Sequence, residues 1–318
     1  MSNVTNSMDR KSLYQPITVN SAEAERISRP QLSYGKDVMR RFFKNKAALI
    51  STILLLIIVL MSIIGPMMVQ YDYRTTDTKL AASIRIKGGT MGPNSEHWFG
   101  IDKLGRDLWA RVWMGTRYSL LIGFTAAIVQ AMIGIIMGCI AGFFGGWVDM
   151  LIMRAIDILN AIPYLIYVII IMMVFGSGLM PILMALALTG WLGMARLVRG
   201  QILMLKNEDY ILAARNLNTS SVRTMLKHLV PNCMGVIVVS LSMAIPSAIF
   251  SEAFLSFLGI GLPAPMTSLG QLISLGIGEM KNYPYQLFIP SAVISLLMLS
   301  LQLIGDGLRD ALDPKLRK

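Results

Sequence analysis

Long apolar runs without a charged residue alternate along this chain with shorter polar segments. Runs of 23 residues or more that lack Asp, Glu, Lys and Arg cover residues 47–70, 118–148, 158–195, 229–251 and 282–305. A helix rises about 1.5 Å per residue, so about 20 apolar residues cross the hydrocarbon core of a bilayer. Each of these runs is therefore long enough to span a membrane as a helix.

The run over 158–195 contains 38 residues, which is too long for one span. Gly176-Ser177-Gly178 interrupts its middle, so we interpret it as two helices, the first of which begins near Leu151. The pattern thus predicts six spans, near 47–69, 118–145, 151–175, 179–198, 233–257 and 285–305. Alternating ten-residue strands are absent from the sequence, so we expect an all-α polytopic membrane protein.

The composition supports this class, because 54% of the 318 residues are hydrophobic and only 15% are charged. The net charge is +11. The basic residues are divided between the two predicted faces of the membrane. We therefore attribute the positive charge to the orientation of the spans and to contact with anionic lipid. No nucleic-acid partner is expected.

Basic residues before the first span predict its orientation. Six Lys or Arg residues between Arg29 and Lys46 are opposed nearby only by Asp37, which places the N-terminus in the cytoplasm. Six spans then return the C-terminal tail, 308–318, to the same side. The segment 71–117 would be external although it carries eight Lys and Arg residues. At 47 residues it is long, and the first span usually dominates orientation.

The region before the first span, 1–46, reads as a cytoplasmic tail. Its first 34 or so residues are polar and rich in Ser, Asn and Thr, so we expect them to be disordered and to contain no cleavable signal. An amphipathic helix around Met39 and Phe43 is expected to lie along the membrane surface.

A polar, basic segment over 206–232 separates two of the apolar runs. Its spacing predicts two short helices, with Ser220 or Ser221 at the start of the second and Pro231 at its end. The apolar faces would consist of Tyr210, Ala213, Ala214 and Leu217, then Val222, Met225, Leu226 and Leu229. Together with Arg215, Arg223 and Lys227 they could dock a second protein. An ordinary loop lying on the membrane surface fits the periodicity equally well.

This segment resembles the "EAA" coupling loop of the permease subunits of bacterial ABC importers. Leu212-Ala213-Ala214 stands for the triplet, Asn218 for the following glycine, and Leu229-Val230-Pro231-Asn232 for the end. Leu212 replaces the glutamate, so a salt bridge from that position is absent. Asn is the non-glycine residue that best tolerates a left-handed turn, so we expect a positive φ at Asn218.

Three further segments resemble the dipeptide, oligopeptide and nickel permeases of that superfamily. They are His97–Asp107 before the second span, Glu252–Gly261 at the end of the fifth, and Gly305–Pro314 in the tail. The resemblance covers about residues 95–318 and is specific to the second, C-type permease subunit. The tail and the long external segment favour an oligopeptide importer, with a dipeptide or nickel permease as alternatives.

The resemblance implies a type I ABC importer permease fold in a bacterial cell membrane. A first helix over 47–70 would precede a core of five helices over 118–307, with a cytoplasmic coupling loop at 201–232. The implied partners are a second homologous permease, two ATP-binding subunits and an extracytoplasmic peptide-binding protein. ATP would reside on the partners, and no cofactor or metal on this chain. The coupling surface would comprise Tyr210, Ala213, Ala214, Arg215, Leu217, Asn218, Arg223 and Lys227.

Several charged residues lie where spans begin or end. Asp102, Arg106 and Asp107 are expected to form an external ion-pair lattice that caps the second span. Arg154 and Asp157, one turn apart, are expected to pair with each other. Glu252 is an ionisable residue within a span, so it is a candidate for the pathway or a gate. It could instead accept hydrogen bonds from the backbone of the 259–265 turn.

Enzymatic chemistry finds little support. His97 and His228 are far apart, and Cys139 and Cys233 form no CxxC motif and are not expected to form a disulfide. The sequence contains no G-x-x-x-x-G-K-[ST] phosphate loop, so ATP-driven transport requires a separate subunit. An ATP-independent channel or secondary transporter would be expected to show internal repeats or paired intramembrane charges. A membrane-embedded enzyme is the third alternative.

Overall fold

The computed structural model describes residues 34–74 and 92–313 of the chain. The chain divides into two units, 1–37 and 38–318. Of the first, the described part is the beginning of helix α2 (Tyr34–Lys44), and the account below concerns the second. The helix expected around Met39 and Phe43 is confirmed, whereas the expectation of a disordered tail falls on residues outside the described ranges.

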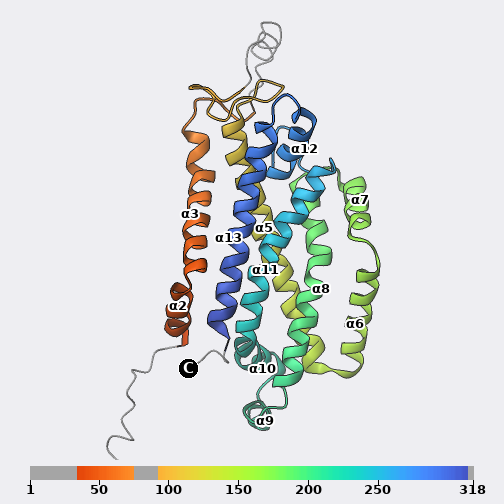
Figure 1. Cartoon of the computed structure of the whole chain (residues 1–318). Helices are drawn as coiled ribbons and strands as arrows, with labels where there is room; N and C mark the ends of the chain where they lie inside the picture. Colours follow the sequence, from red (N-terminus) through yellow and green to blue (C-terminus); the bar gives the residue numbers. More distant parts are fainter. Residues whose placement is uncertain (1–33, 75–91, 314–318) are drawn as a thin grey trace, which may run out of the picture. The chain divides into compact units, whose positions relative to one another are not determined.

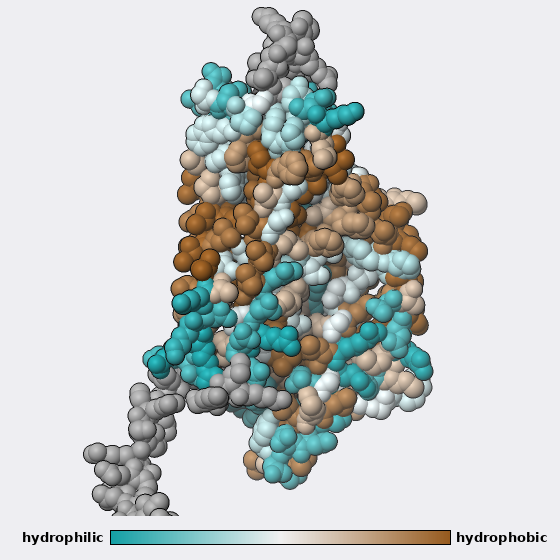
Figure 2. All heavy atoms as spheres, viewed as in Figure 1, coloured by the Kyte–Doolittle hydropathy of each residue, from teal (hydrophilic) through white to brown (hydrophobic). Residues whose placement is uncertain are grey.

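The regular elements of the described ranges are helical (Figure 1). Five helices are long and apolar enough to cross a membrane, and the number rises to six if the bent pair of shorter helices, α6 and α7, is counted as one span. The five are α3 (Lys46–Ile64), α5 (Leu108–Phe144), α8 (Leu179–Leu205), α11 (Val230–Phe257) and α13 (Tyr285–Leu312). On the face shown in Figure 2, hydrophobic side chains form a band between hydrophilic ends, as a bilayer requires.

The third predicted span differs from the prediction. It consists of α6 (Gly146–Ala161) and α7 (Tyr164–Phe175), which meet at 85°, instead of one helix over 151–175. Pro163 causes the break, because the residue before a proline is driven out of the helical region, and Ile162 is extended with φ −90° and ψ 128°. The predicted interruption at Gly176-Ser177-Gly178 is confirmed, since α7 ends at Gly176 with φ 78°.

The second span begins at Leu108, ten residues before the predicted start at Tyr118. The segment expected to be external over 71–117 therefore includes the first turns of α5, and its residues 75–91 lie outside the described ranges. The charges that end the apolar run are satisfied within the bundle. Arg111 pairs with Asp102, and Arg117 donates to the carbonyl oxygens of Ser62 and Ile63 at 3.0 and 3.1 Å.

Glycines let α5 pack directly on α8. Gly134, Gly138 and Gly142 lie four residues apart on one face of α5 and form a small-residue stripe. A Cβ atom at Gly138 would meet the Ala195 carbonyl oxygen at 2.6 Å and the Val198 Cβ at 2.8 Å. No side chain larger than hydrogen fits there, so the two backbones pack in contact.

α12 (Leu269–Glu279) lies at the end of the bundle where α5 begins, and Figure 1 shows it beside the first turns of α5 and α13 and the last turns of α11. A Cβ at Gly115 of α5 would meet the backbone carbon of Ser268 at 3.1 Å. Ser268 in turn caps α12 by accepting a hydrogen bond from the Gln271 N–H at 3.2 Å. The α12 end of the bundle is therefore tightly joined.

We predict that Gly138→Leu will destabilise the protein by about 1–3 kcal/mol, because the inserted side chain meets backbone atoms of α8 that cannot rotate away. The midpoint temperature of thermal unfolding in detergent, measured by size-exclusion chromatography, should be lower for Gly138→Leu than for the unmodified protein. Gly200→Ala on α8 is the control, since its added Cβ meets no atom within 4 Å. Equal midpoints for the two variants would contradict close packing at Gly138.

Candidate functional site

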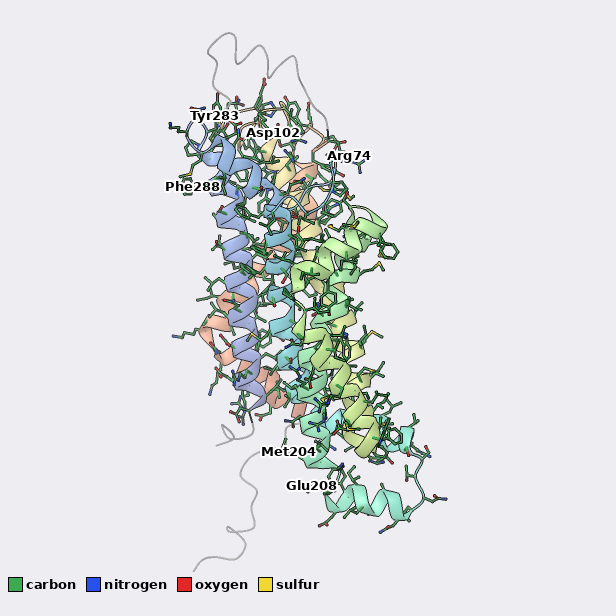
Figure 3. The ribbon with its side chains drawn as sticks, turned by 90° about the vertical axis from the view of Figure 1, so that its right-hand side faces the viewer. Arg74, Asp102, Met204, Glu208, Tyr283 and Phe288 are labelled. Carbon is green, nitrogen blue, oxygen red and sulfur yellow. The ribbon has the colours of Figure 1, made fainter. Side chains whose placement is uncertain are left out.

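A helix–turn–helix follows α8 and projects beyond the end of the bundle. It contains α9 (Asp209–Asn216) and α10 (Ser221–Thr224), and Figure 3 shows α9, next to the labelled Glu208, beyond Met204 of α8. The two predicted short helices are thus confirmed. Ser220 occupies the N-cap position of α10, although its side chain makes no capping hydrogen bond.

The predicted stop at Pro231 is wrong. A π-helical turn, Met225–Leu229, joins α10 to α11, and Pro231 lies in the first turn of α11. Proline is tolerated at the first turn of a helix, where its missing N–H group is not required by the hydrogen-bond ladder. The second loop helix and the fifth span therefore form one continuous helical element over Ser221–Phe257.

Asn218 makes the turn between α9 and α10 with φ 56°, which confirms the expected left-handed conformation. It is the only residue other than glycine with a positive φ in the described ranges. Around it, the Leu217 and Thr219 N–H groups donate to the carbonyl oxygens of Ala213 and Ala214 at 3.0 and 3.1 Å, which closes the end of α9. Asparagine thus does here what glycine commonly does at helix ends.

One side of the loop packs against the bundle. Ile211, Met225 and Leu229 are buried and share a hydrophobic cluster with Val198 and Ile202 of α8. The second predicted face is therefore divided, because Met225 and Leu229 face the bundle while its other two members face outward. The residue that anchors α9, Ile211, was not part of the predicted face, which included the neighbouring Tyr210.

The other side of the loop exposes apolar and basic side chains together. Leu217 is 82% exposed, and the exposed apolar set also includes Tyr210, Leu212, Val222 and Leu226. Arg223, Lys227 and Ala213 are exposed as well, whereas Ala214 is half-buried. The side chain of Arg215 lies outside the described set. Five large apolar side chains on a loop that projects from a bundle are typical of a protein–protein contact.

Polar contacts fix the loop to two long helices, α5 and α11. The Lys206 ammonium donates to the Gly142 carbonyl oxygen at the end of α5, at 3.2 Å. The Asn232 side-chain amide of α11 donates to the Tyr210 hydroxyl at 3.2 Å and to the His228 carbonyl oxygen at 2.7 Å. The loop is thus tied to α5 and α11 and continues α8.

Ion pairs join α8 to α6 near the same end. Arg199 pairs with Asp149, and Arg196 lies 3.0 Å from Asp157. The predicted pair of Arg154 with Asp157 is therefore wrong. The two residues do share one helix, but Arg196 of the neighbouring α8 occupies the Asp157 carboxylate instead.

The opposite end of α5 carries an ion-pair lattice, in which the predicted pairing of Asp102 with Arg106 and the predicted cap of the second span at Asp107 are confirmed. The Asp102 carboxylate accepts from the Arg106 Nε at 2.8 Å and from two backbone N–H groups, and it also pairs with the buried Arg111. The Asp107 carboxylate caps α5 through the Ala110 N–H at 2.8 Å and lies 2.8 Å from the His97 Nδ1. Arg111 is a further member of this lattice, and its place in the sequence did not predict it.

Glu252 of α11 is fully buried, and its partners differ from those expected. Its carboxylate accepts from the Ser119 hydroxyl at 3.0 Å and the Ser256 hydroxyl at 2.7 Å, instead of from the 259–265 backbone. The Ser268 hydroxyl at the start of α12 donates to the Ser256 oxygen at 3.1 Å. This series of hydrogen bonds joins α5, α11 and α12 inside the packed interior. Glu252 lines no part of the groove described next.

A groove of about 550 Å³ lies among α5, α7, α8 and α11. Polar side chains from all four helices line it, and the described residues that line it include none that is charged. The polar set consists of Gln130, Tyr164, Thr189, Ser240, Ser247 and Ser251. Sequence reasoning missed this set, although Ser240, Ala244, Ser247 and Ser251 recur at the spacing of one helix face.

Several membrane-crossing helices, a polar groove among them and an exposed apolar and basic loop at one end are typical of the membrane component of a transporter. The family described as "binding-protein-dependent transport system inner membrane component" matches residues 134–318, and the N-terminal domain of oligopeptide transport permease C matches residues 33–84. The chain therefore belongs to the C-type permease family of oligopeptide and dipeptide transport systems. The recognition made from its motifs is confirmed.

Curated relatives match along nearly the whole chain. The oligopeptide transport system permease protein OppC of Bacillus subtilis is 46% identical over 97% of this chain and 98% of its own length. The dipeptide permease DppC of the same organism is 42% identical over 93% and 90%, and OppC of Escherichia coli is 40% identical over 92% and 95%.

Solved structures confirm the type I importer permease fold. An inward-facing structure of the MetNI methionine ABC transporter superimposes with a TM-score of 0.52 over 64% of this chain and 96% of that one. The identity of that pair is 18%, so this likeness concerns the fold alone.

We predict that Asp102→Asn will destabilise the fold by about 3–5 kcal/mol, because it leaves the buried Arg111 guanidinium without its counter-ion. Asp157→Asn makes the same chemical change at a pair whose side chains are 44% and 57% exposed, and it should cost less than about 1 kcal/mol. Thermal unfolding in detergent measures both. Similar losses at the two sites would show that the lattice does not hold the α12 end of the bundle together.

Proposed function

We propose that this chain is a membrane subunit of an ATP-driven importer of peptides, with oligopeptides as the main cargo. It forms the translocation path with a second, homologous permease, and two separate ATP-binding subunits drive it. An extracytoplasmic binding protein delivers the peptide. The names of the relatives support peptides as the cargo, and the dipeptide permease among them makes dipeptides the second candidate.

The observation that carries this proposal is the divided surface of the loop over 201–232. Its inner side is packed on α8, while its outer side leaves five apolar residues and two cations uncovered. The two exposed cations beside the apolar set favour a partner with acidic side chains at the rim of an apolar groove. An ATP-binding subunit with such a groove would receive the loop.

Transmission from this loop to the path requires no further element. The loop connects α8 with α11, and both helices line the groove. Movement of the ATP-binding subunits would therefore tilt the groove walls as rigid bodies and shift the population between inward-open and outward-open states.

The proposed topology places both termini and the loop in the cytoplasm and the region between α3 and α5 outside, in a bacterial cell membrane. The basic residues before α3 support this orientation.

We predict that Leu217→Glu will abolish capture of the ATP-binding subunits and peptide uptake while the permease still inserts and folds. Leu217 is 82% exposed, so the substitution disturbs no packing within the chain and acts only on a partner. Leu104→Glu changes an exposed leucine at the opposite end of the bundle and should leave capture unchanged. Capture is measured by affinity purification from detergent. Normal capture by the Leu217 variant would refute docking at this surface.

We also predict opposite labelling of two exposed serines replaced by cysteine, in a chain that lacks Cys139 and Cys233. With an impermeant thiol reagent on intact cells, Ser95→Cys should react and Ser220→Cys should not. Opened membranes provide the control, because both positions should then react. The reverse pattern on intact cells would overturn the topology and the direction of transport.

A further inference from the structure

We propose that the groove among α5, α7, α8 and α11 is this subunit's wall of the peptide path. Three serines of α11, Ser240, Ser247 and Ser251, form a serine row along the groove. Together with Tyr164 and Gln130, this row binds the main-chain amides of an extended peptide and makes no specific contact with its side chains. This inference rests on the proposed function and adds to it the residues of the path and the chemistry that they recognise.

The serine row runs along the middle of α11. Ser240, Ser247 and Ser251 all line the groove, and Ala244 fills the remaining position on the same face. Ser247 and Ser251 are four residues apart, which is about 6 Å along a helix. Amide groups on one side of an extended chain repeat every two residues, or about 6.6 Å. The hydroxyls of Ser247 and Ser251 can therefore meet successive amides of one peptide.

Most of the hydrogen-bonding capacity of the row is unused. Among the described residues the hydroxyls of Ser240 and Ser247 have no hydrogen-bond partner, and the buried Tyr164 hydroxyl has none either. The Ser251 hydroxyl donates to the Ser247 carbonyl oxygen at 2.9 Å, which leaves its lone pairs free to accept. A hydroxyl both donates and accepts, so it can pair with either the N–H or the C=O of a peptide group.

Gln130 adds an amide that is held in place. Its Nε2 donates to the Leu186 carbonyl oxygen at 3.0 Å, and its side chain lies directly against Gly190, which has no Cβ to displace it. With Nε2 engaged, the Oε1 of Gln130 is the atom available to a peptide N–H. A polar contact thus faces the serine row from α5.

The absence of charge from the described lining explains how one path can pass many peptides. A fixed charge would hold an oppositely charged side chain and repel a like one, and both effects grow in surroundings of low dielectric constant. Neutral hydroxyls bind the part that all peptides share. Met194 and Met243, which also line the groove, offer flexible apolar surface to whatever side chains arrive.

Gly193 allows a charge to be introduced without disturbing the fold. It lines the groove from α8, and a Cβ atom there would meet no atom within 4 Å. Gly278 on α12 has the same open surroundings but does not line the groove, so it provides the matched control.

The first test measures uptake of Ala-Ala-Lys-Ala-Ala and Ala-Ala-Glu-Ala-Ala by the complete importer in vesicles. Gly193→Lys should lower the ratio of lysine-peptide to glutamate-peptide uptake by about fivefold or more relative to wild type, and Gly193→Asp should raise it similarly. Gly278→Lys should leave it unchanged. Because ratios are compared with wild type, the preference of the binding protein cancels.

The second test removes one hydroxyl at a time. Ser247→Ala should reduce uptake of both peptides equally, by about twofold to tenfold at subsaturating peptide. Ser242→Ala, on the same helix, removes a hydroxyl that already donates to the Val238 carbonyl oxygen at 2.8 Å and does not line the groove, so it should have no effect.

The outcomes separate this inference from the proposed function. Failure of the wild-type importer to take up either peptide would refute the proposed function. Normal wild-type uptake with an unchanged ratio in both Gly193 variants would refute the groove as the path. A loss in Ser247→Ala confined to one of the two peptides would refute recognition of the main chain.

Discussion

α5 and α8 come into backbone contact because three glycines of α5 face α8 at intervals of four residues. At Gly142 a Cβ atom would meet the Ile202 Cβ at 2.8 Å, and at Gly134 it would meet the Met194 Cβ at 2.6 Å. In a membrane, lipid is as apolar as a leucine side chain, so helices associate through close packing instead of through the hydrophobic effect. The other helices and the loop pack around this pair of helices.

Both ends of α5 are fixed by further polar contacts. At one end the Arg111 guanidinium is buried and paired, which joins α5 to the 97–107 segment and to Thr267 before α12. At the other end the Gly142 carbonyl oxygen accepts from Lys206, so the loop starts from a fixed point. Between them, Gln130 of α5 faces the serine row across the groove. One helix thus positions the lattice, the groove and the loop.

Hydrophobic pattern alone predicts where the spans lie, since residues facing lipid leave the longest signal in the sequence. It predicts their ends less well. α5 begins within a charged segment because Asp102 neutralises Arg111, and that partner is visible only in three dimensions. The bend at Pro163 could have been predicted, because proline restricts the residue before it. It was not predicted, because Pro163 lies within an apolar run that indicates a continuous helix.

The helix–turn–helix loop was predictable because such a motif has a local period, and Asn218 has a local conformational preference. The groove was not, because its lining comes from four helices that are separated by up to 121 positions, from Gln130 to Ser251. The predicted partners of Glu252 and Asp157 were wrong because the residues that contact them lie far away in the sequence. Ser119 and Arg196 come from other helices, and spacing along one helix does not reveal them.

The continuous helical element from Ser221 to Phe257 contains 37 residues, or about 55 Å at the rise of an α-helix. It carries part of the exposed apolar and basic surface at one end and the serine row farther along. If this element turns as one body about a point within the bilayer, its two ends move in opposite directions. In an importer built on it, closing one mouth of the path and opening the other would be a single motion, and no pair of independently timed gates would be needed.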